Sequence, residues 1–194
     1  MAVNTACAKC VVGQHTVGEY IKDCEERGWP YKLVPDEEPF QFGPGRQIWS
    51  EQALLAICVW GGDVIVVRIS IVDADVPFLI SKFVFKRIGG VLDLDDNVLV
   101  MKRLGNATEP LYDLKTGHVG IELLKAKSAV PVVSTETLDI CADGEEVMVE
   151  NTAYRKALNP VARGHGVHMV DLTPVKQVSL SPEVEIRPDE ANAD

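Results

Sequence analysis

The chain has few basic residues for its length. Its 19 Lys and Arg are outnumbered by 29 Asp and Glu, which gives a formal net charge of -10 at pH 7. A surface this acidic repels a phosphate backbone unless its bases are clustered, and the longest basic clusters are the dipeptides Lys86-Arg87 and Lys102-Arg103. The charge balance therefore predicts that nucleic acid is not a partner.

Long hydrophobic runs and regular cysteine spacing are also missing. The longest apolar run, Val64 to Ile71, is interrupted by Arg68 and is far shorter than the roughly 18–20 residues of a membrane-spanning helix. Met1 to Cys10 is too short and too polar for a signal peptide. The five cysteines are an odd number at irregular spacing, unlike a disulfide framework. We therefore expect a reduced, intracellular, cytoplasmic protein with no membrane partner.

What is present suits one folded domain with appendages. The 194 residues are 46% hydrophobic and 25% charged, as in ordinary globular proteins. We expect a mostly β domain over residues 1–125 with one or two short helices. Prolines punctuate residues 126–182, so we expect a poorly ordered extension of uncertain fold there, with short strands at 147–149 and 167–170. Residues 183–194 are acidic and predict a disordered tail.

Two segments have helical periodicity. Residues 15–27 place four apolar side chains on one face, and Thr16 followed by Glu19 predicts an N-cap with a capping box. Residues 81–88 predict a second helix that ends at Gly89-Gly90. Its expected core-facing side chains are Phe83, Val84, Phe85 and Ile88.

The remaining pattern is that of strands. Residues 53–60 and 64–72 predict a hairpin around Gly61-Gly62-Asp63, and their continuous apolarity predicts that both faces are buried. Residues 40–49 predict a second hairpin with an exposed tip at Gly43-Pro44-Gly45. We expect a connection without strands over residues 29–39. Further strands are expected at 78–80, 91–94, 98–101 and 119–123.

Patterns typical of metal and redox sites occur in the chain, but buried thiols explain its cysteines better. Cys7-x-x-Cys10 followed by His15 begins like a zinc knuckle, but Cys24 lies too far along the chain and on the expected helix. The same cysteine pair lacks the βαβ surroundings of a thioredoxin-type site. Asp93 to Asn97 lacks the glycine and terminal glutamate of a calcium loop. The sequence therefore predicts no metal and no cofactor.

Two motifs in fixed order resemble those of the retropepsin-like aspartic proteases of retroelements. The first is Val3-Asn4-Thr5-Ala6, where the family has an apolar residue, Asp, Thr or Ser, and Gly. The second is Asp75 to Ser81, followed by the helix and by Gly89 to Leu94. The likeness covers roughly residues 3–124. It implies a closed β-barrel fold that is N-terminally truncated here, as in a piece of a longer polyprotein.

The resemblance assigns roles to three groups of residues. Asn4, Thr5 and Ala6 would occupy the catalytic loop, with Asn4 at the position of the catalytic Asp. Phe42, Gly43, Pro44 and Gly45 would form a flap over the substrate. Phe78, Leu79, Ile80 and Ser81 would form the strand beside the catalytic loop, with Ser81 where the family usually has Gly.

The substitution at Asn4 bears directly on activity. In this family two subunits each supply one Asp, and the two carboxylates share a proton and activate a water. Asn4 can form hydrogen bonds, but it cannot act as a general base. We therefore expect an inactive homologue of an aspartic endopeptidase that binds a peptide or polyprotein segment as a homodimer. The alternatives are a peptide-binding or dimerising scaffold module and a non-functional retroelement fragment.

Overall fold

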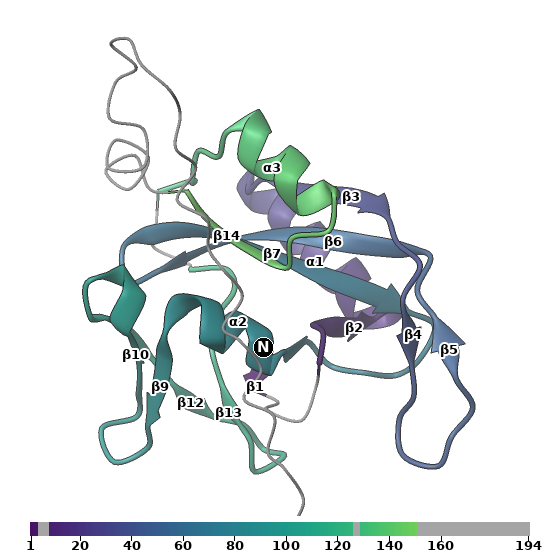
Figure 1. Cartoon of the computed structure of the whole chain (residues 1–194), viewed down its shortest axis with the longest axis horizontal. Coiled ribbons are helices and arrows are strands. Elements are labelled where there is room, and N and C mark those ends of the chain that lie inside the picture. Colours follow the sequence, from purple (N-terminus) through teal and green to yellow (C-terminus); the bar gives the residue numbers. More distant parts are fainter. Residues whose placement is uncertain (4–7, 126–128, 151–194) are drawn as a thin grey trace, which may run out of the picture. The chain divides into compact units, whose positions relative to one another are not determined.

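A computed structural model describes residues 1–3, 8–125 and 129–150. The expected mostly β fold is confirmed, and the described residues also form three α-helices (Figure 1). The strands form a nine-stranded sheet, a three-stranded sheet and a two-stranded hairpin.

The centre of the large sheet is the hairpin of β6 (Gln52–Trp60) and β7 (Asp63–Val72). The two strands pair antiparallel along their whole length, with Ala56 opposite Val67. Gly61 and Gly62 both have positive φ, which a tight turn between two long strands requires. The hairpin predicted from the apolar pattern is therefore confirmed.

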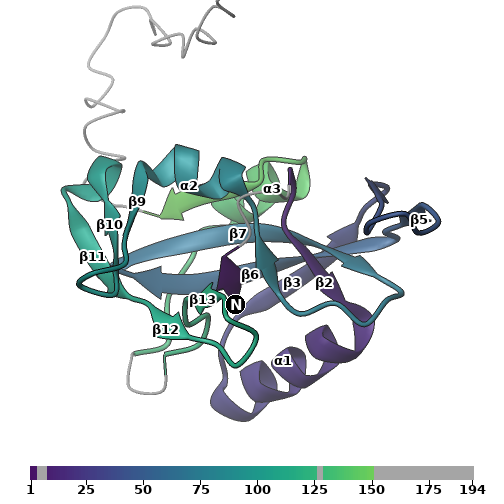
Figure 2. The same cartoon turned by 90° about the horizontal axis from the view of Figure 1, so that it is seen from below.

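Both faces of this hairpin are buried, as the sequence predicts. One set of alternating β6 residues, Leu54, Ala56, Cys58 and Trp60, packs in the main core with side chains of helix α1 (Gln14–Arg27). The other set, Ala53, Leu55 and Ile57, packs in a second core with Cys141 of helix α3 (Thr135–Ala142). Figure 2 shows α1 and α3 on opposite sides of the β6–β7 layer. Strand periodicity of two residues explains this division.

Helix α1 confirms the predicted element but not its predicted cap. Val17, Tyr20 and Cys24 are buried on one face, and Gly28 ends the helix in the left-handed conformation. The helix begins one residue before His15, its N-cap is Gly13, and no side chain caps it. The capping box expected of Thr16 and Glu19 is therefore wrong, because Thr16 already lies inside the helix.

The large sheet has the order β12-β13-β1-β8-β2-β7-β6-β3. The strands not yet bounded are β1 (Ala2–Val3), β2 (Val11–Gly13), β3 (Tyr31–Pro35), β8 (Leu79–Ile80), β12 (Tyr112–Asp113) and β13 (Val119–Gly120). Within the described residues the order ends at β12 and at β3, so the expected closed barrel is not found. Residues 29–39 were expected to lack strands, but β3 pairs with β6. Only Val34 of β3 is buried, so local alternation gives little signal there.

The smaller elements follow the predicted order. Helix α2 (Lys82–Ile88) is followed by β9 (Gly90–Asp93), β10 (Val98–Met101), the 3-10 turn η1 (Lys102–Leu104) and β11 (Ala107–Pro110). Val84, Phe85 and Ile88 of α2 are buried as expected. Phe83 is 41% exposed, so its predicted place in the core is wrong. It lies under the Arg87 guanidinium instead, with 5.7 Å between the guanidinium carbon and the ring centre.

Residues beyond 125 contribute to the same sheet. Helix α3 precedes β14 (Val147–Glu150), which pairs antiparallel with the first half of β7 and confirms the strand expected at 147–149. We call residues 134–150 the C-terminal strap. Ser134 caps α3 by accepting a hydrogen bond from the Thr137 amide. The expectations for residues 167–170 and 183–194 lie outside the described residues.

Candidate functional site

The predicted catalytic residues Asn4, Thr5 and Ala6 lie outside the described residues, but both flanks of that segment are described. Val3 ends β1 on one side, and the chain continues from Ala8 to β2 on the other. The geometry of the candidate site is therefore set by what holds β1 and β2.

Strand β8 holds both flanks at once. It pairs parallel with β1, with Val3 opposite Ile80, and antiparallel with β2, with Val11 opposite Leu79. The Ala2 amide also donates to the Phe78 carbonyl at 2.8 Å. Strand β8, within the predicted supporting strand Phe78 to Ser81, thus lies between β1 and β2, the strands on either side of the first motif.

Gly13 fixes how closely the chain returns beside this strand. Its amide donates to the Val76 carbonyl at 2.8 Å. A Cβ at position 13 would lie 2.2 Å from the Ala74 carbonyl oxygen and 2.8 Å from the Val76 amide nitrogen, which is closer than atoms can approach. Only glycine therefore allows the end of β2 to lie this close to residues 74–76.

Ser81 joins the second motif to the end of the first. Its amide donates to the Cys10 sulfur at 3.2 Å, and its hydroxyl caps α2 by accepting from the Val84 amide. The same hydroxyl donates to a Glu146 carboxylate oxygen at 2.7 Å, which also accepts from the Cys10 amide at 2.8 Å. Burial, with a smaller contribution from the Glu146 charge, raises the pKa of the Cys10 thiol far above its ordinary value. Cys10 is therefore a neutral, structural thiol rather than a nucleophile.

The predicted flap is the hairpin of β4 (Pro39–Phe40) and β5 (Ile48–Trp49). Gly43 has positive φ in its turn, and residues 41–47 are exposed. The Gly45 amide donates to the Phe42 carbonyl at 3.2 Å, and the Phe42 ring stacks on Phe40 with centres 6.4 Å apart. These contacts of the predicted flap residues Phe42, Gly43, Pro44 and Gly45 lie within the hairpin, and the structure does not bring them against β8.

The base of this hairpin does reach the candidate site. Ser50 and Glu38 face each other across it: the Glu38 amide donates to the Ser50 hydroxyl and the Ser50 amide donates to the Glu38 carbonyl. The Glu38 carboxylate forms an ion pair with Lys9, one residue before Cys10. The hairpin is thus anchored beside residues 8–10.

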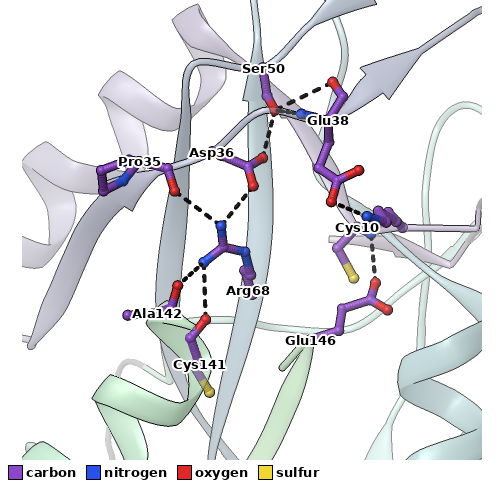
Figure 3. Close-up of polar contacts among 10 residues, drawn as sticks. Cys10, Pro35, Asp36, Glu38, Ser50, Arg68, Cys141, Ala142 and Glu146 are labelled. Atoms are coloured by element: carbon purple, nitrogen blue, oxygen red, sulfur yellow. Dashed lines mark hydrogen bonds and ion pairs between the residues drawn. The ribbon is translucent and has the colours of Figure 1, made fainter. Parts of the chain in front are cut away.

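Arg68 is the centre of a polar junction behind this anchor. Its guanidinium donates to the carbonyls of Pro35, Cys141 and Ala142, and it pairs with the Asp36 carboxylate at 2.7 Å (Figure 3). The side chains of Arg68 and Asp36 are only 13% and 3% exposed. Burial alone would raise the pKa of Asp36, but hydrogen bonds from Ser50, Ser70 and Arg68 outweigh it and hold the pKa below its ordinary value. We call Arg68, Asp36, Ser50 and the three carbonyls the Arg68 junction.

A cavity of about 300 Å³ lies between residues 8–10, α2 and the C-terminal strap. It is lined by Ala8, Lys9, Cys10, Glu38, Arg68, Ser70, Phe83, Gly144, Glu145 and Glu146. The carboxylates in this lining are already engaged: Glu38 with Lys9, Glu145 with Arg87, and Glu146 with Cys10 and Ser81. This arrangement holds backbone in place and does not present a pair of carboxylates to a water.

Cys7, the first cysteine of the zinc-knuckle pattern, lies outside the described residues, and the other members of the pattern are not brought together. Cys10 and Cys24 are buried in the main core, whereas the His15 side chain is 84% exposed beside Glu19. Within residues 1–3, 8–125 and 129–150, no group of three His, Cys, Asp or Glu side chains is arranged to hold a metal ion.

Several residues that shape the site were not identified from the sequence. Arg68 carried a signal, since it is the single charge in the run Val64 to Ile71, and a buried charge needs partners. Glu146 and Asp36 carried no comparable signal, because acidic residues are common throughout this chain. Their roles depend on contacts between distant residues. Glu146 contacts Ser81, which is 65 positions away, and Asp36 contacts Arg68, which is 32 positions away.

None of the helices in the described part of the chain is long and apolar enough to cross a membrane. No protein-family model matches the chain, and no curated protein matches it.

Proposed function

We propose that the chain is a retropepsin-like aspartic protease homologue whose peptide-binding frame is kept and whose catalytic acid is absent. The observation that carries the proposal is the position of β8 between β1 and β2. This pairing holds the described residues on both sides of the first motif, strands β1 and β2, against the second motif. The resemblance implies such a strand beside the catalytic loop. The proposal rests on the pairing of β8 with β1 and β2, and it does not need a closed barrel.

Asn4 accounts for the missing chemistry. Hydrolysis by this route needs one carboxylate to take a proton from water and a second, protonated carboxyl group to donate to the substrate carbonyl. A dimer of this chain would bring two amides together. General acid–base catalysis by a positioned side chain contributes about 10²–10⁴-fold to a rate, so its loss would leave little activity.

The β4–β5 hairpin supports a peptide as the ligand. Its base is tied to the loop through Glu38 and Lys9, while Phe42 and Trp49 are 37% and 54% exposed. Exposed aromatic side chains on a hairpin anchored beside the site offer apolar contact to an extended peptide, and strand addition supplies main-chain hydrogen bonds.

Peptide hydrolysis by the wild-type chain and by Asn4→Asp tests the proposal. A library of peptides with apolar residues on both sides of the scissile bond serves as substrate, and sedimentation measures the dimer fraction at each chain concentration. We expect cleavage by Asn4→Asp in proportion to dimer, and none by the wild type. Asn4→Ala serves as the matched control that adds no carboxylate.

Three of the following four results would contradict the proposal, and one would invalidate the assay. Cleavage by the wild-type chain would show that the carboxylate is not needed, and cleavage by Asn4→Ala would point to a contaminating protease. A folded, dimeric Asn4→Asp chain that cleaves nothing would favour a scaffold module without a catalytic frame. A monomeric chain that also binds no peptide would favour a non-functional fragment.

A further inference from the structure

The C-terminal strap contacts the candidate site at one side chain, Glu146. One oxygen of its carboxylate accepts two hydrogen bonds, from the Cys10 amide at 2.8 Å and from the Ser81 hydroxyl at 2.7 Å. Cys10 ends the segment that carries the first motif, and Ser81 ends the second motif. Glu146 therefore bridges two segments that are 71 positions apart in sequence and are themselves joined through the Ser81 amide and the Cys10 sulfur.

The backbone of the strap is fixed at the same point. The Arg68 amide donates to the Glu146 carbonyl at 2.8 Å, where β14 begins its pairing with β7. The edge of β7 is shared at this place: β14 pairs with Val64 to Val67, and β2 pairs with Ser70 to Val72. Arg68 stands between the two stretches, so Glu146 lies directly beside the start of β2.

Contacts at the two ends of α2 add to this arrangement. Glu146 binds the N-cap residue Ser81, while its neighbour Glu145 forms an ion pair with Arg87 in the last turn. The two adjacent carboxylates therefore hold one helix at both ends. Only Glu146 also contacts the segment that follows the predicted catalytic loop.

We propose that Glu146 is a positioning residue that fixes Cys10 against the start of α2, so that the C-terminal strap supports the described residues that follow the first motif. We call the two hydrogen bonds that Glu146 accepts from Cys10 and Ser81 the Glu146 clamp. Its significance for peptide binding rests on the proposed function. The clamp itself is a matter of hydrogen bonds among described residues. Charge-assisted hydrogen bonds of this kind are stronger than neutral ones, so a single side chain suffices to hold the backbone.

Amide hydrogen exchange of the full chain, resolved residue by residue by NMR, tests the clamp. Glu146→Ala removes the acceptor, and Glu145→Ala is the matched control in the same strap. We expect Glu146→Ala to speed exchange of the Cys10 amide about 10-fold or more, the factor expected from loss of a hydrogen bond to a charged group. Glu145→Ala should change it less than about 3-fold. The amides of Leu55 and Val66 report whether the central hairpin stays folded.

Two conservative variants separate the clamp from general weakening of the strap. Glu146→Gln keeps an acceptor oxygen at the same reach and should retain part of the Cys10 protection, because a neutral acceptor is weaker than a carboxylate. Glu146→Asp keeps the charge but shortens the side chain, so it should lose that protection. If Glu146→Ala fails to fold, this pair still decides the question. Unchanged Cys10 exchange in folded Glu146→Ala and Glu146→Asp, or equal acceleration by Glu145→Ala, would overturn the proposal.

The link to the site is read separately in the Asn4→Asp background. Addition of Glu146→Asp there should lower peptide affinity or kcat, and Glu146→Gln in its place should lower them less. If Asn4→Asp binds and cleaves nothing while the Cys10 amide still depends on Glu146, the proposed function fails and the clamp stands. If activity is present and independent of position 146, the clamp has no part in the site and the proposal is overturned.

Discussion

The central β6–β7 hairpin and the Arg68 junction share one strand but are held in opposite ways. In the register of the hairpin, Leu55 and Arg68 lie directly opposite each other. Leu55 is fully buried among apolar side chains of the second core, whereas Arg68 places a charge between three carbonyls and the Asp36 carboxylate. The hairpin needs only bulk apolar packing, which many residues can supply. The junction needs particular partners from β3 and from the C-terminal strap, and it joins those segments to the sheet.

Breaking the junction should have the largest effect on stability. Arg68→Met removes the guanidinium, leaves the Asp36 carboxylate buried without its ion-pair partner and removes the hydrogen bonds from Arg68 to the Cys141 and Ala142 carbonyls. We expect a loss of about 3–5 kcal/mol in the free energy of unfolding, measured by urea denaturation. Arg103→Met, an exposed position, should change the same quantity by less than about 0.5 kcal/mol. A loss below about 1 kcal/mol for Arg68→Met would mean that the junction is dispensable.

The opposite residue of the hairpin provides the direct comparison. Leu55→Ala leaves a cavity between β6 and α3, and we expect it to cost about 2–5 kcal/mol. The distinguishing result is the response to a conservative change. Leu55→Met should cost less than about 1.5 kcal/mol because apolar volume is kept. Arg68→Lys should recover only part of the loss of Arg68→Met, since one ammonium cannot reach all four acceptors. If Leu55→Met and Arg68→Lys lowered the free energy of unfolding equally, the hairpin and the junction would not differ in how they are held.

Acid should weaken the junction before it weakens the hairpin. The pKa of Asp36 in the folded chain lies below its ordinary value of 3.8, so the folded state favours the ionised form. The stabilisation from Asp36 is therefore full above pH 3.8 and is lost as the pH falls through the lowered folded pKa. Urea denaturation of wild type and Asp36→Asn across this range should show the steeper loss in the wild type. Parallel pH profiles would mean that Asp36 is not the group responsible.

The Lys9–Glu38 ion pair should have the smallest effect. Its side chains are 48% and 33% exposed, so solvent screens the attraction. Lys9→Ala is expected to change the free energy of unfolding by about 0–1 kcal/mol. The Glu38 and Ser50 backbone pairing at the hairpin base should persist, and exchange of the Ser50 amide measures it. Loss of that protection in Lys9→Ala would show that the pair, rather than the backbone, anchors the hairpin.

The same contrast explains what the sequence predicted. The β6–β7 hairpin, α1, α2 and the strand at 147–149 each carry a local pattern, and the structure confirms them. Strand β3 and helix α3 have weak patterns of their own and depend on contacts with β6 and β7, so they were missed. The Thr16 cap was wrong because Gly13 can begin the helix without a side-chain cap. The resemblance implied only a strand beside the catalytic loop. Its pairing with both β1 and β2 was not predicted, since no local pattern encodes it.

The contribution of Glu146 to the candidate site was beyond sequence reasoning for a similar reason. Nothing local distinguishes it from Glu145, yet one of these carboxylates contacts Cys10 and Ser81 and the other contacts Arg87. The choice between them depends on where β14 starts its pairing with β7. Long-range register of this kind is fixed by tertiary packing rather than by neighbouring residues.

Calorimetric titration with two peptides tests the central claim most directly, because it separates the peptide-binding frame from the missing carboxylate. One peptide contains statine, whose hydroxyl takes the place of the attacking water, and the matched peptide lacks that hydroxyl. We predict that wild type and Asn4→Asp bind the matched peptide with the same Kd, and that Asn4→Asp binds the statine peptide at least about 100-fold more tightly than the wild type, as expected for a transition-state analogue. Failure of both chains to bind either peptide, or equal statine affinity in both, would contradict the account.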